Sequence, residues 1–150
     1  MYDVYFEDIS VGDVDEFGVY QVTKAEVIEF ATKYDPQPFH LDEEKAKKSV
    51  FGGLCASGWH TCAMTMRMLV DHLHARRVAS MGSPGMDSIK WIRPVMVGDT
   101  LHVKASVDAK RESKSRPEIG FLKGTYKITN QKGENVMIMH SNYMVAKRKQ

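Results

Sequence analysis

The spacing of apolar residues changes partway along this chain of 150 residues, and the change limits the folds it can adopt. In the first half, apolar residues recur every three to four positions, which is the period of a helix. From about residue 100 they alternate with polar residues, as in a strand with one covered face. No linker or internal repeat divides the sequence. We therefore expect one α+β domain over residues 1–150, with an antiparallel sheet because short turns join consecutive strands.

Two short helices are expected early in the chain. Thr23 and Glu26 have the spacing of a capping box, in which each side chain bonds the other residue's backbone N–H. Apolar residues with helical spacing then continue to Tyr34, and the prolines that follow should end the helix there. A second helix should begin after Asp42, because acidic residues followed by lysines suit the two ends of its dipole.

A longer helix is predicted from Trp59 to about His74. Its apolar stripe consists of Trp59, Cys62, Ala63, Met66, Leu69, Val70 and Leu73. Met64 and Met68 lie off this stripe, so the helix is apolar on more than one side. We therefore expect it to be buried within the fold.

Strands fill the rest of the chain. Those predicted lie near Asp15–Tyr20, around Ile89 and Trp91 with an end at Pro94, over residues 101–107, over 122–128 and over 137–145. Polar residues 112–117 and 130–133 are predicted to form turns between the last three strands.

Composition excludes several classes of protein. Lys and Arg number 21 against 19 Asp and Glu, and this balance argues against a nucleic-acid partner. No apolar run is long enough to span a membrane and no signal-peptide pattern is present, so we expect a cytoplasmic protein without a membrane partner. Cys55 and Cys62 lack the spacing of metal ligands, and we expect them to be small buried residues without a disulfide. No metal site is predicted.

A proline-braced segment, Asp35-Pro36-Gln37-Pro38-Phe39-His40, carries the clearest chemical signal. Two prolines should keep this segment out of a helix. On such a stiff turn the carboxylate of Asp35 and the imidazole of His40 can converge. A carboxylate and an imidazole that face one point can move protons to and from a bound water. The alternative is a pair of surface polar residues tied to the turn.

Ser57 and Gly58 stand where the long helix should begin. The first amides of a helix have no internal partner, and with the positive end of the dipole they stabilise an anion. The Gly58 N–H could therefore bind a thioester oxygen that becomes an enolate. The alternative is that Ser57 caps the helix and Gly58 allows close packing.

Two stretches of this sequence together resemble the MaoC-like dehydratase family, which includes the (R)-specific enoyl-CoA hydratases. They are Asp35-Pro36-Gln37-Pro38-Phe39-His40-Leu41-Asp42 and Phe51-Gly52-Gly53-Leu54-Cys55-Ala56-Ser57-Gly58-Trp59-His60. The resemblance extends to Phe6-Glu7-Asp8-Ile9 with Val11-Gly12, and to Lys90-Trp91-Ile92-Arg93-Pro94-Val95 with Gly98-Asp99-Thr100, so it spans most of the chain. It implies the hot-dog fold, in which an antiparallel sheet wraps a long central helix, and a homodimer or higher homo-oligomer.

The resemblance also implies an activity. By position, Asp35 and His40 match the family's catalytic pair, and Gly58 matches its oxyanion-binding amide. The implied reaction adds water to a trans-2-enoyl-CoA to give an (R)-3-hydroxyacyl-CoA. No cofactor is expected, because the CoA thioester is the substrate.

Candidate substrate-binding residues are Gln37, Ser57, Trp59, Lys90 and Arg93. Gln37 departs from the family pattern, since many members have Asn there, and this leaves the loop geometry and substrate choice open. CoA phosphates need basic residues, and Arg76 and Arg77 are further candidates beside Lys90 and Arg93. His60 adjoins the helix start, and the sequence predicts a structural or interface role for it.

Two other functions remain open at this stage. A hot-dog acyl-CoA thioesterase would share the fold and ligand but release free CoA. A non-catalytic acyl-CoA-binding protein is the second alternative, because fold alone does not fix function. The acyl chain length, the pathway and the choice of base between Asp35 and His40 do not follow from the sequence.

Overall fold

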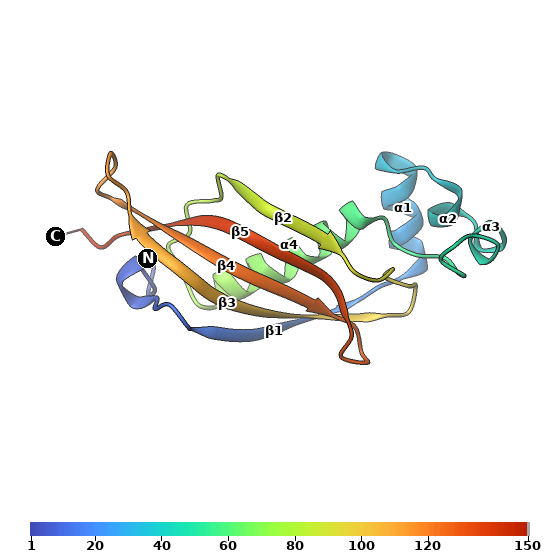
Figure 1. Cartoon of the computed structure of the whole chain (residues 1–150), viewed down its shortest axis with the longest axis horizontal. Helices are drawn as coiled ribbons and strands as arrows, with labels where there is room; N and C mark the ends of the chain where they lie inside the picture. The colour runs from blue at the N-terminus through green and yellow to red at the C-terminus, as the bar shows by residue number, and fades with distance from the viewer. Residues whose placement is uncertain (150) are drawn as a thin grey trace.

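The computed structural model describes residues 1–149, which form one layer of sheet and one layer of helix. In chain order the elements are η1 (Phe6–Asp8), β1 (Val14–Gln21), α1 (Lys24–Tyr34), α2 (Pro38–Leu41), α3 (Glu43–Lys47), α4 (Gly58–Ala75), β2 (Gly85–Trp91), β3 (Thr100–Glu112), β4 (Ile119–Thr129) and β5 (Asn135–Ala146). Figure 1 shows α4 lying along one face of the sheet, with α1, α2 and α3 gathered at one end of the molecule. The chain termini lie at the opposite end.

The five strands form one antiparallel sheet in the order β1-β3-β4-β5-β2. The predicted strands are all present, and the predicted turns at 112–117 and 130–133 join β3 to β4 and β4 to β5. The strand expected to end at Pro94 ends earlier, at Trp91. Residues 92–99 then form the connection that runs past the start of α4.

The buried face of α4 is not the apolar stripe that its sequence suggested. Thr61, Met64, Thr65 and Met68 face the core, where the two methionines pack among apolar residues of the strands. The predicted stripe is exposed or only partly buried, and Trp59 and Met66 are 60% and 47% exposed. The expectation that the whole helix is enclosed was therefore wrong. The sheet covers one side of α4 and leaves an apolar side uncovered.

The helices before α4 begin and end largely as expected. The Thr23 side chain accepts a hydrogen bond from the Glu26 N–H at 3.3 Å, but the Glu26 carboxylate turns toward other partners. The helix α1 ends at Tyr34, and Asp42 accepts from the Lys45 N–H at the start of α3. The prediction that the proline-braced segment is entirely non-helical was wrong.

That segment contains the short helix α2, with Pro38 in its first turn. Proline is tolerated there because its missing N–H would have no helical partner and its φ already suits a helix.

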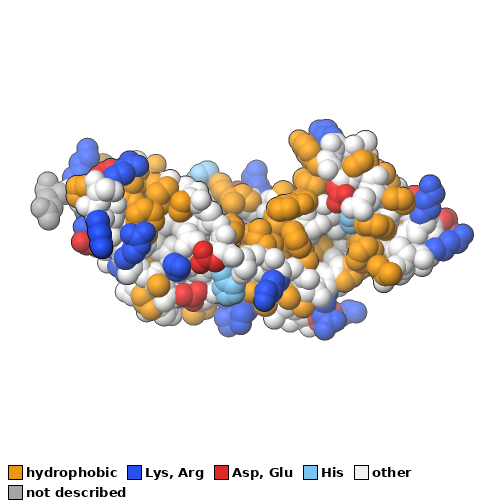
Figure 2. All heavy atoms as spheres, turned by 45° about the horizontal axis from the view of Figure 1, so that its top comes forward, with side chains coloured by type: hydrophobic (Ala, Val, Ile, Leu, Met, Phe, Trp, Pro, Cys, Tyr) orange, Lys and Arg blue, Asp and Glu red, His pale blue; other side chains and the backbone are white. Residues whose placement is uncertain are grey.

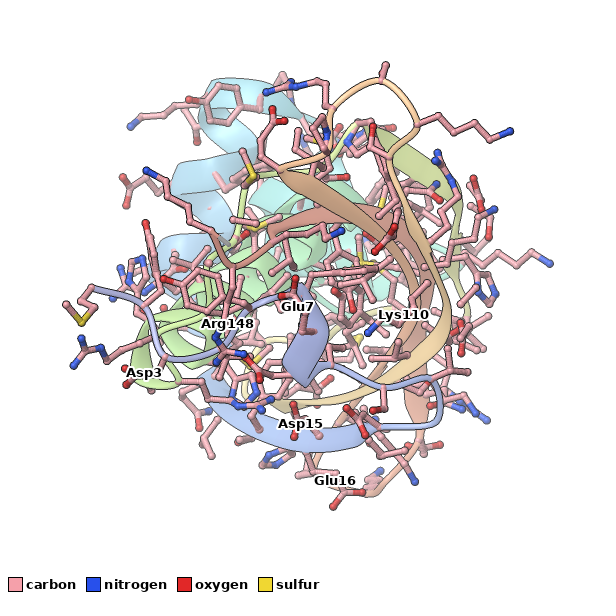
Figure 3. The ribbon with its side chains drawn as sticks, turned by 90° about the vertical axis from the view of Figure 1, so that its left-hand side faces the viewer. Asp3, Glu7, Asp15, Glu16, Lys110 and Arg148 are labelled. Carbon is pink, nitrogen blue, oxygen red and sulfur yellow. The ribbon has the colours of Figure 1, made fainter. Side chains whose placement is uncertain are left out.

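The N-terminal segment closes the end of the molecule that lies away from these helices. Phe6 is buried in a second, smaller cluster of apolar residues. The Lys110 ammonium donates to the Phe6 carbonyl at 2.9 Å, and Arg148 pairs with Asp8 at 2.7 Å (Figure 3). The first contact ties the N-terminal segment to β3, and the second joins the C-terminal residues to that segment.

A curved antiparallel sheet packed around one long helix is the hot-dog arrangement, and the α+β prediction is confirmed. No helix within residues 1–149 is long and apolar enough to cross a lipid bilayer. Because α1 and α2 sit at the N-terminal end of α4, the fold brings the proline-braced segment to the start of the long helix.

Candidate active site

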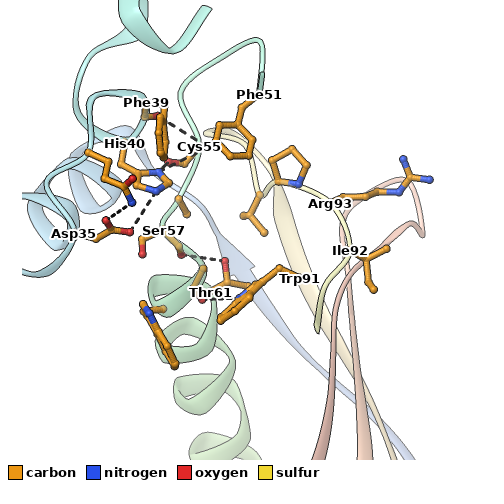
Figure 4. A pocket seen from close by; sticks show the side chains of 16 residues that line it. Asp35, Phe39, His40, Phe51, Cys55, Ser57, Thr61, Trp91, Ile92 and Arg93 are labelled. Carbon is orange, nitrogen blue, oxygen red and sulfur yellow. Dashed lines mark hydrogen bonds and ion pairs between the residues drawn. The ribbon is translucent and has the colours of Figure 1, made fainter. Parts of the chain in front are cut away.

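A cavity of about 440 Å³ opens beside the N-terminus of α4 (Figure 4). Three segments surround it: the α1–α2 connection, the residues that lead into α4, and the stretch after β2. Its lining residues are Asp35, Gln37, Phe39, His40, Phe51, Cys55, Ala56, Ser57, Gly58, Trp59, Thr61, Trp91, Ile92, Arg93, Pro94 and Val95. The fold therefore brings together most of the site residues that the sequence singled out.

Asp35 occupies the position directly after α1, and its backbone is held in place. Its N–H donates to the Ala31 carbonyl, and its own carbonyl accepts from the Gln37 N–H at 2.8 Å. The side-chain amide of Gln37 donates to Asp35 Oδ1 at 2.7 Å. That bond turns the second carboxylate oxygen, Oδ2, toward His40. Gln37 thus orients the carboxylate in this chain.

His40 lies on α2 and is 5% exposed. Its Nδ1 lies 2.7 Å from the Cys55 carbonyl oxygen. A carbonyl oxygen can only accept, so Nδ1 carries a proton and donates. This bond fixes the tautomer, and Nε2 is the nitrogen that can exchange a proton. Nε2 lies 3.4 Å from Asp35 Oδ2, longer than a charge-assisted hydrogen bond.

The Asp35 carboxylate is held in its charged form. Burial raises its pKa and is the largest single influence, but the Ser57 hydroxyl, the Gln37 amide and nearby His40 outweigh it. The net result is a pKa below the ordinary value. The Ser57 hydroxyl is fully buried beside this carboxylate without a well-aligned hydrogen bond. Because Nδ1 carries a proton, the neutral form of the ring has Nε2 as an acceptor that faces Oδ2, and a water can donate to both atoms.

Gly58 is the first residue of α4, and its N–H has no acceptor within residues 1–149. Ser57 makes no side-chain cap to the helix, so the predicted alternative that it caps α4 is wrong. The alternative that Gly58 permits close packing has support, because a Cβ there would lie 2.7 Å from the Trp91 ring. The free amide and the close packing occur together.

The remaining candidates separate into two groups. Trp59 and Arg93 line the cavity, whereas Lys90 is exposed on β2 and does not. Arg76 and Arg77 follow the C-terminal end of α4, roughly 27 Å from Gly58 at the usual helical rise. Arg76 pairs with Asp15 and Arg77 with Asp3, far from the cavity.

His60 points away from the cavity. It is 3% exposed, its ring stacks on Phe30 with centroids 4.7 Å apart, and its Nε2 lies 3.4 Å from Glu26 Oε1. Burial lowers its pKa, while Glu26 acts in the opposite direction. These contacts agree with the structural role predicted for it.

Cys55 matters through its backbone rather than its thiol. Burial raises the pKa of the thiol to about 11, so it stays protonated and unreactive at neutral pH. Its carbonyl, which fixes the His40 tautomer, was not foreseen, because backbone acceptors leave no trace in the sequence. Cys62 is only partly buried, and both cysteines are free thiols.

Trp91 and Phe51 also line the cavity and were not predicted to do so. Phe51 begins the second of the two stretches that resemble the family, and Trp91 lies in the further stretch from Lys90, so the resemblance was the available signal.

Fold and site define a hot-dog protein with a carboxylate–imidazole pair at the N-terminus of its central helix. Residues 12–130 match the model of the MaoC like domain, and the chain belongs to that family. A solved MaoC-like dehydratase from Rhodospirillum rubrum is 40% identical, with a TM-score of 0.87 over 99% of this chain and 100% of that one.

Three further relatives carry names of different kinds. The uncharacterized protein YdeM of Bacillus subtilis is 31% identical over 84% of this chain and 87% of its own length. The 3-hydroxybutyryl-CoA dehydratase of Methylorubrum extorquens is 29% identical over 69% of this chain and 64% of that protein. An (R)-hydratase from A. caviae involved in PHA biosynthesis is 25% identical, with a TM-score of 0.70 over 91% of this chain and 97% of that one.

Proposed function

We propose that this protein is an (R)-specific hydratase that interconverts trans-2-enoyl-CoA and (R)-3-hydroxyacyl-CoA. The observation that carries the proposal is the Asp35–His40 pair in a cavity that also contains the unpaired Gly58 amide. The names of the dehydratase and (R)-hydratase relatives support the same reaction class.

The Gly58 amide is the proposed electrophilic group. Its N–H donates to the thioester carbonyl, and the positive end of the α4 dipole adds to this field. Electron density then moves toward the carbonyl oxygen, which makes C3 of the enoyl chain electrophilic. The enolate that forms on attack is the species that the amide stabilises most.

The proposed nucleophile is a water on the cavity side of Asp35 Oδ2 and His40 Nε2, bound by both atoms. These two atoms are 3.4 Å apart, and each can accept a hydrogen bond from one O–H group of the water. A lone pair of the water oxygen is then directed at the substrate. As the oxygen–C3 bond forms, one member of the pair takes a proton. A proton then passes from the pair to C2 on the same face, and the C2–C3 π bond is consumed.

The proposed reaction needs no cofactor, since the thioester itself accepts the electron pair. Arg93 is the basic residue at the cavity that could contact CoA phosphates. It is exposed, and its only ion pair within residues 1–149 is with Glu134 at 3.3 Å. A surface ion pair of this kind is weak enough to be exchanged for a phosphate.

We propose that the protein acts as a homodimer. Trp59, Met66, Trp91 and Ile92 are between 45% and 60% exposed. Figure 2 shows hydrophobic side chains gathered on the middle of one face of the molecule. Exposed apolar side chains of this kind, here from α4 and the end of β2, are typical of a protein interface. Sedimentation should show a dimer for the parent and a folded monomer for Met66→Lys. An unchanged dimer in that variant would place the interface elsewhere.

Loss of crotonyl-CoA absorbance, with chiral analysis of the product, tests the hydratase proposal. A panel of enoyl-CoAs of increasing length then defines the acyl pocket. Release of free thiol from saturated acyl-CoA, without hydration, would identify a thioesterase instead. Tight binding of acyl-CoA with no turnover of either kind would identify a binding protein.

A further inference from the structure

The start of α4 is held by the neighbouring sheet rather than by a helix cap. A helix normally fixes its first turn with a side chain at the N-cap, but Ser57 makes no such bond. The first helical residue is glycine, the residue with the most backbone freedom. A site that depends on the direction of the Gly58 N–H therefore needs another constraint.

Trp91 supplies contacts of the required kind. Its indole N–H donates to the Gly58 carbonyl at 2.9 Å. Its ring also covers the Gly58 α-carbon so closely that a Cβ would lie 2.7 Å from ring atom Cε2. Trp59 packs edge-on against the same ring, with centroids 5.3 Å apart. The Trp91 ring thus contacts the first two residues of α4.

Trp91 is itself fixed by the sheet. It is the last residue of β2 and pairs with Met137 of β5, and the next N–H, of Ile92, donates to Val136 at 2.8 Å. Four residues after Trp91, the Val95 carbonyl accepts a hydrogen bond from the Ala56 N–H at 2.8 Å.

The peptide unit that joins Ser57 to Gly58 is therefore flanked by two hydrogen bonds to residues 91–95. One bond is at Ala56 and the other at the Gly58 carbonyl.

We propose that Trp91 is a positioning residue that aims the Gly58 N–H at the thioester oxygen. This inference rests on the proposed function, and it assigns to Trp91 a role in polarising the carbonyl rather than in binding the acyl chain. The indole N–H limits rotation of the Gly58 backbone, and the ring excludes water from one side of the oxyanion site.

A matched pair of variants isolates the indole N–H. Trp91→Phe keeps a six-membered ring but loses the ring N–H, whereas Trp91→His keeps a ring N–H in a smaller ring. We expect Trp91→Phe to lower kcat by roughly ten- to a hundredfold, the scale of a slightly misplaced reacting group, with a smaller change in KM. Trp91→His should recover part of the loss. Equal kcat values for the two variants would overturn the role of the N–H.

Infrared spectroscopy of a bound, unreactive ligand gives a readout that a merely structural role would not move. With butyryl-CoA labelled with ¹³C at the carbonyl, the parent should lower the C=O stretching frequency relative to the free ligand. Trp91→Phe should lower it less at matched saturation. An identical frequency in both proteins would overturn the proposal. Tyr2→Phe, which removes one hydroxyl from a half-exposed ring outside the cavity, is the control.

A double-mutant cycle tests the packing contact separately. Gly58→Ala retains the N–H but places a methyl group against the Trp91 ring. Its effect on kcat should be large in the parent and much smaller in a Trp91→Ala background. Additive effects would show that Trp91 does not act through Gly58. If the parent hydrates no enoyl-CoA, the proposed function fails, while the infrared comparison still tests Trp91.

Discussion

Two buried histidines near the start of α4 face carboxylates at the same distance, yet their surroundings differ. His40 Nε2 lies 3.4 Å from Asp35, and His60 Nε2 lies 3.4 Å from Glu26. Glu26 lies on α1, and Asp35 directly follows the last residue of that helix. Both histidines are at most 5% exposed. By residue type and distance alone, either pair could be a proton-transfer site.

The second ring nitrogen distinguishes the two pairs. His40 Nδ1 donates to the Cys55 carbonyl, so its tautomer is fixed and Nε2 is free to exchange a proton beside the cavity. His60 Nδ1 is buried and has no hydrogen-bond partner among residues 1–149, and its ring is stacked on Phe30. The Glu26 carboxylate also accepts a hydrogen bond from the Tyr20 hydroxyl.

Both pairs border a cavity, so the difference lies in the second ring nitrogen and in the neighbouring groups. The Asp35–His40 pair has a fixed tautomer and shares its cavity with the Gly58 amide, while the Glu26–His60 pair ties α1 to α4.

The largest expected difference is in catalysis. Asp35→Asn and His40→Gln should each lower kcat by about 10²–10⁴-fold, the usual contribution of a proton-transfer group. His60→Gln should leave most of the activity. The decay of crotonyl-CoA absorbance measures all three. Equal losses for His40→Gln and His60→Gln would remove the distinction between the pairs.

The next effect is on stability. His60→Ala removes a buried ring that packs on Phe30, and we expect the free energy of unfolding to fall by about 3 kcal/mol. Denaturant titration measures this value. Asp35→Asn should cost less stability, because the carboxylate is partly exposed at the cavity. A larger stability loss for Asp35→Asn than for His60→Ala would contradict the division of roles.

The two pairs should also respond to acid in different pH ranges. Burial lowers the pKa of His60 below 6.5, so the unfolded chain binds that proton first as the pH falls. The free energy of unfolding should thus decrease below pH 6.5, by at most about 1.4 kcal/mol per pH unit from this group. His60→Phe should flatten that slope. Asp35, whose pKa is lowered from 3.8, should contribute only at still lower pH.

The smallest effect concerns Glu26, whose side chain is 43% exposed. Glu26→Gln should change the free energy of unfolding by less than about 1 kcal/mol. It should also reduce the pKa of Tyr20, which burial and then Glu26 raise to about 12. Tyrosinate absorbance during alkaline titration tests this. An unaltered titration curve would show that Glu26 does not act on Tyr20.

Local sequence signals predicted the elements better than their packing. Thr23 marked the start of α1, the prolines marked its end at Tyr34, and the alternating residues located β3, β4 and β5. The helical turn α2 was missed, because Pro38 was interpreted as a helix breaker although it lies in a first turn. Such errors arise where one residue suits two backbone states.

The burial of α4 shows a different limit. Its apolar stripe was evident from the spacing, but the side that the sheet covers is the one with Thr61, Met64, Thr65 and Met68. A hydrophobic period shows that a helix has an apolar side. It does not show whether the chain's own sheet or another surface covers that side.

By itself the sequence determined the α+β class, the stiff segment with Asp35 and His40, and a glycine at the start of the long helix. These features follow from backbone preferences and side-chain spacing, which act over a few residues. The tertiary structure decided the tautomer of His40, the packing of His60 against Phe30 of α1 and the contact of Trp91 with Gly58. Each depends on groups from 15 to 33 residues apart or on separate elements, and only packing brings such groups together.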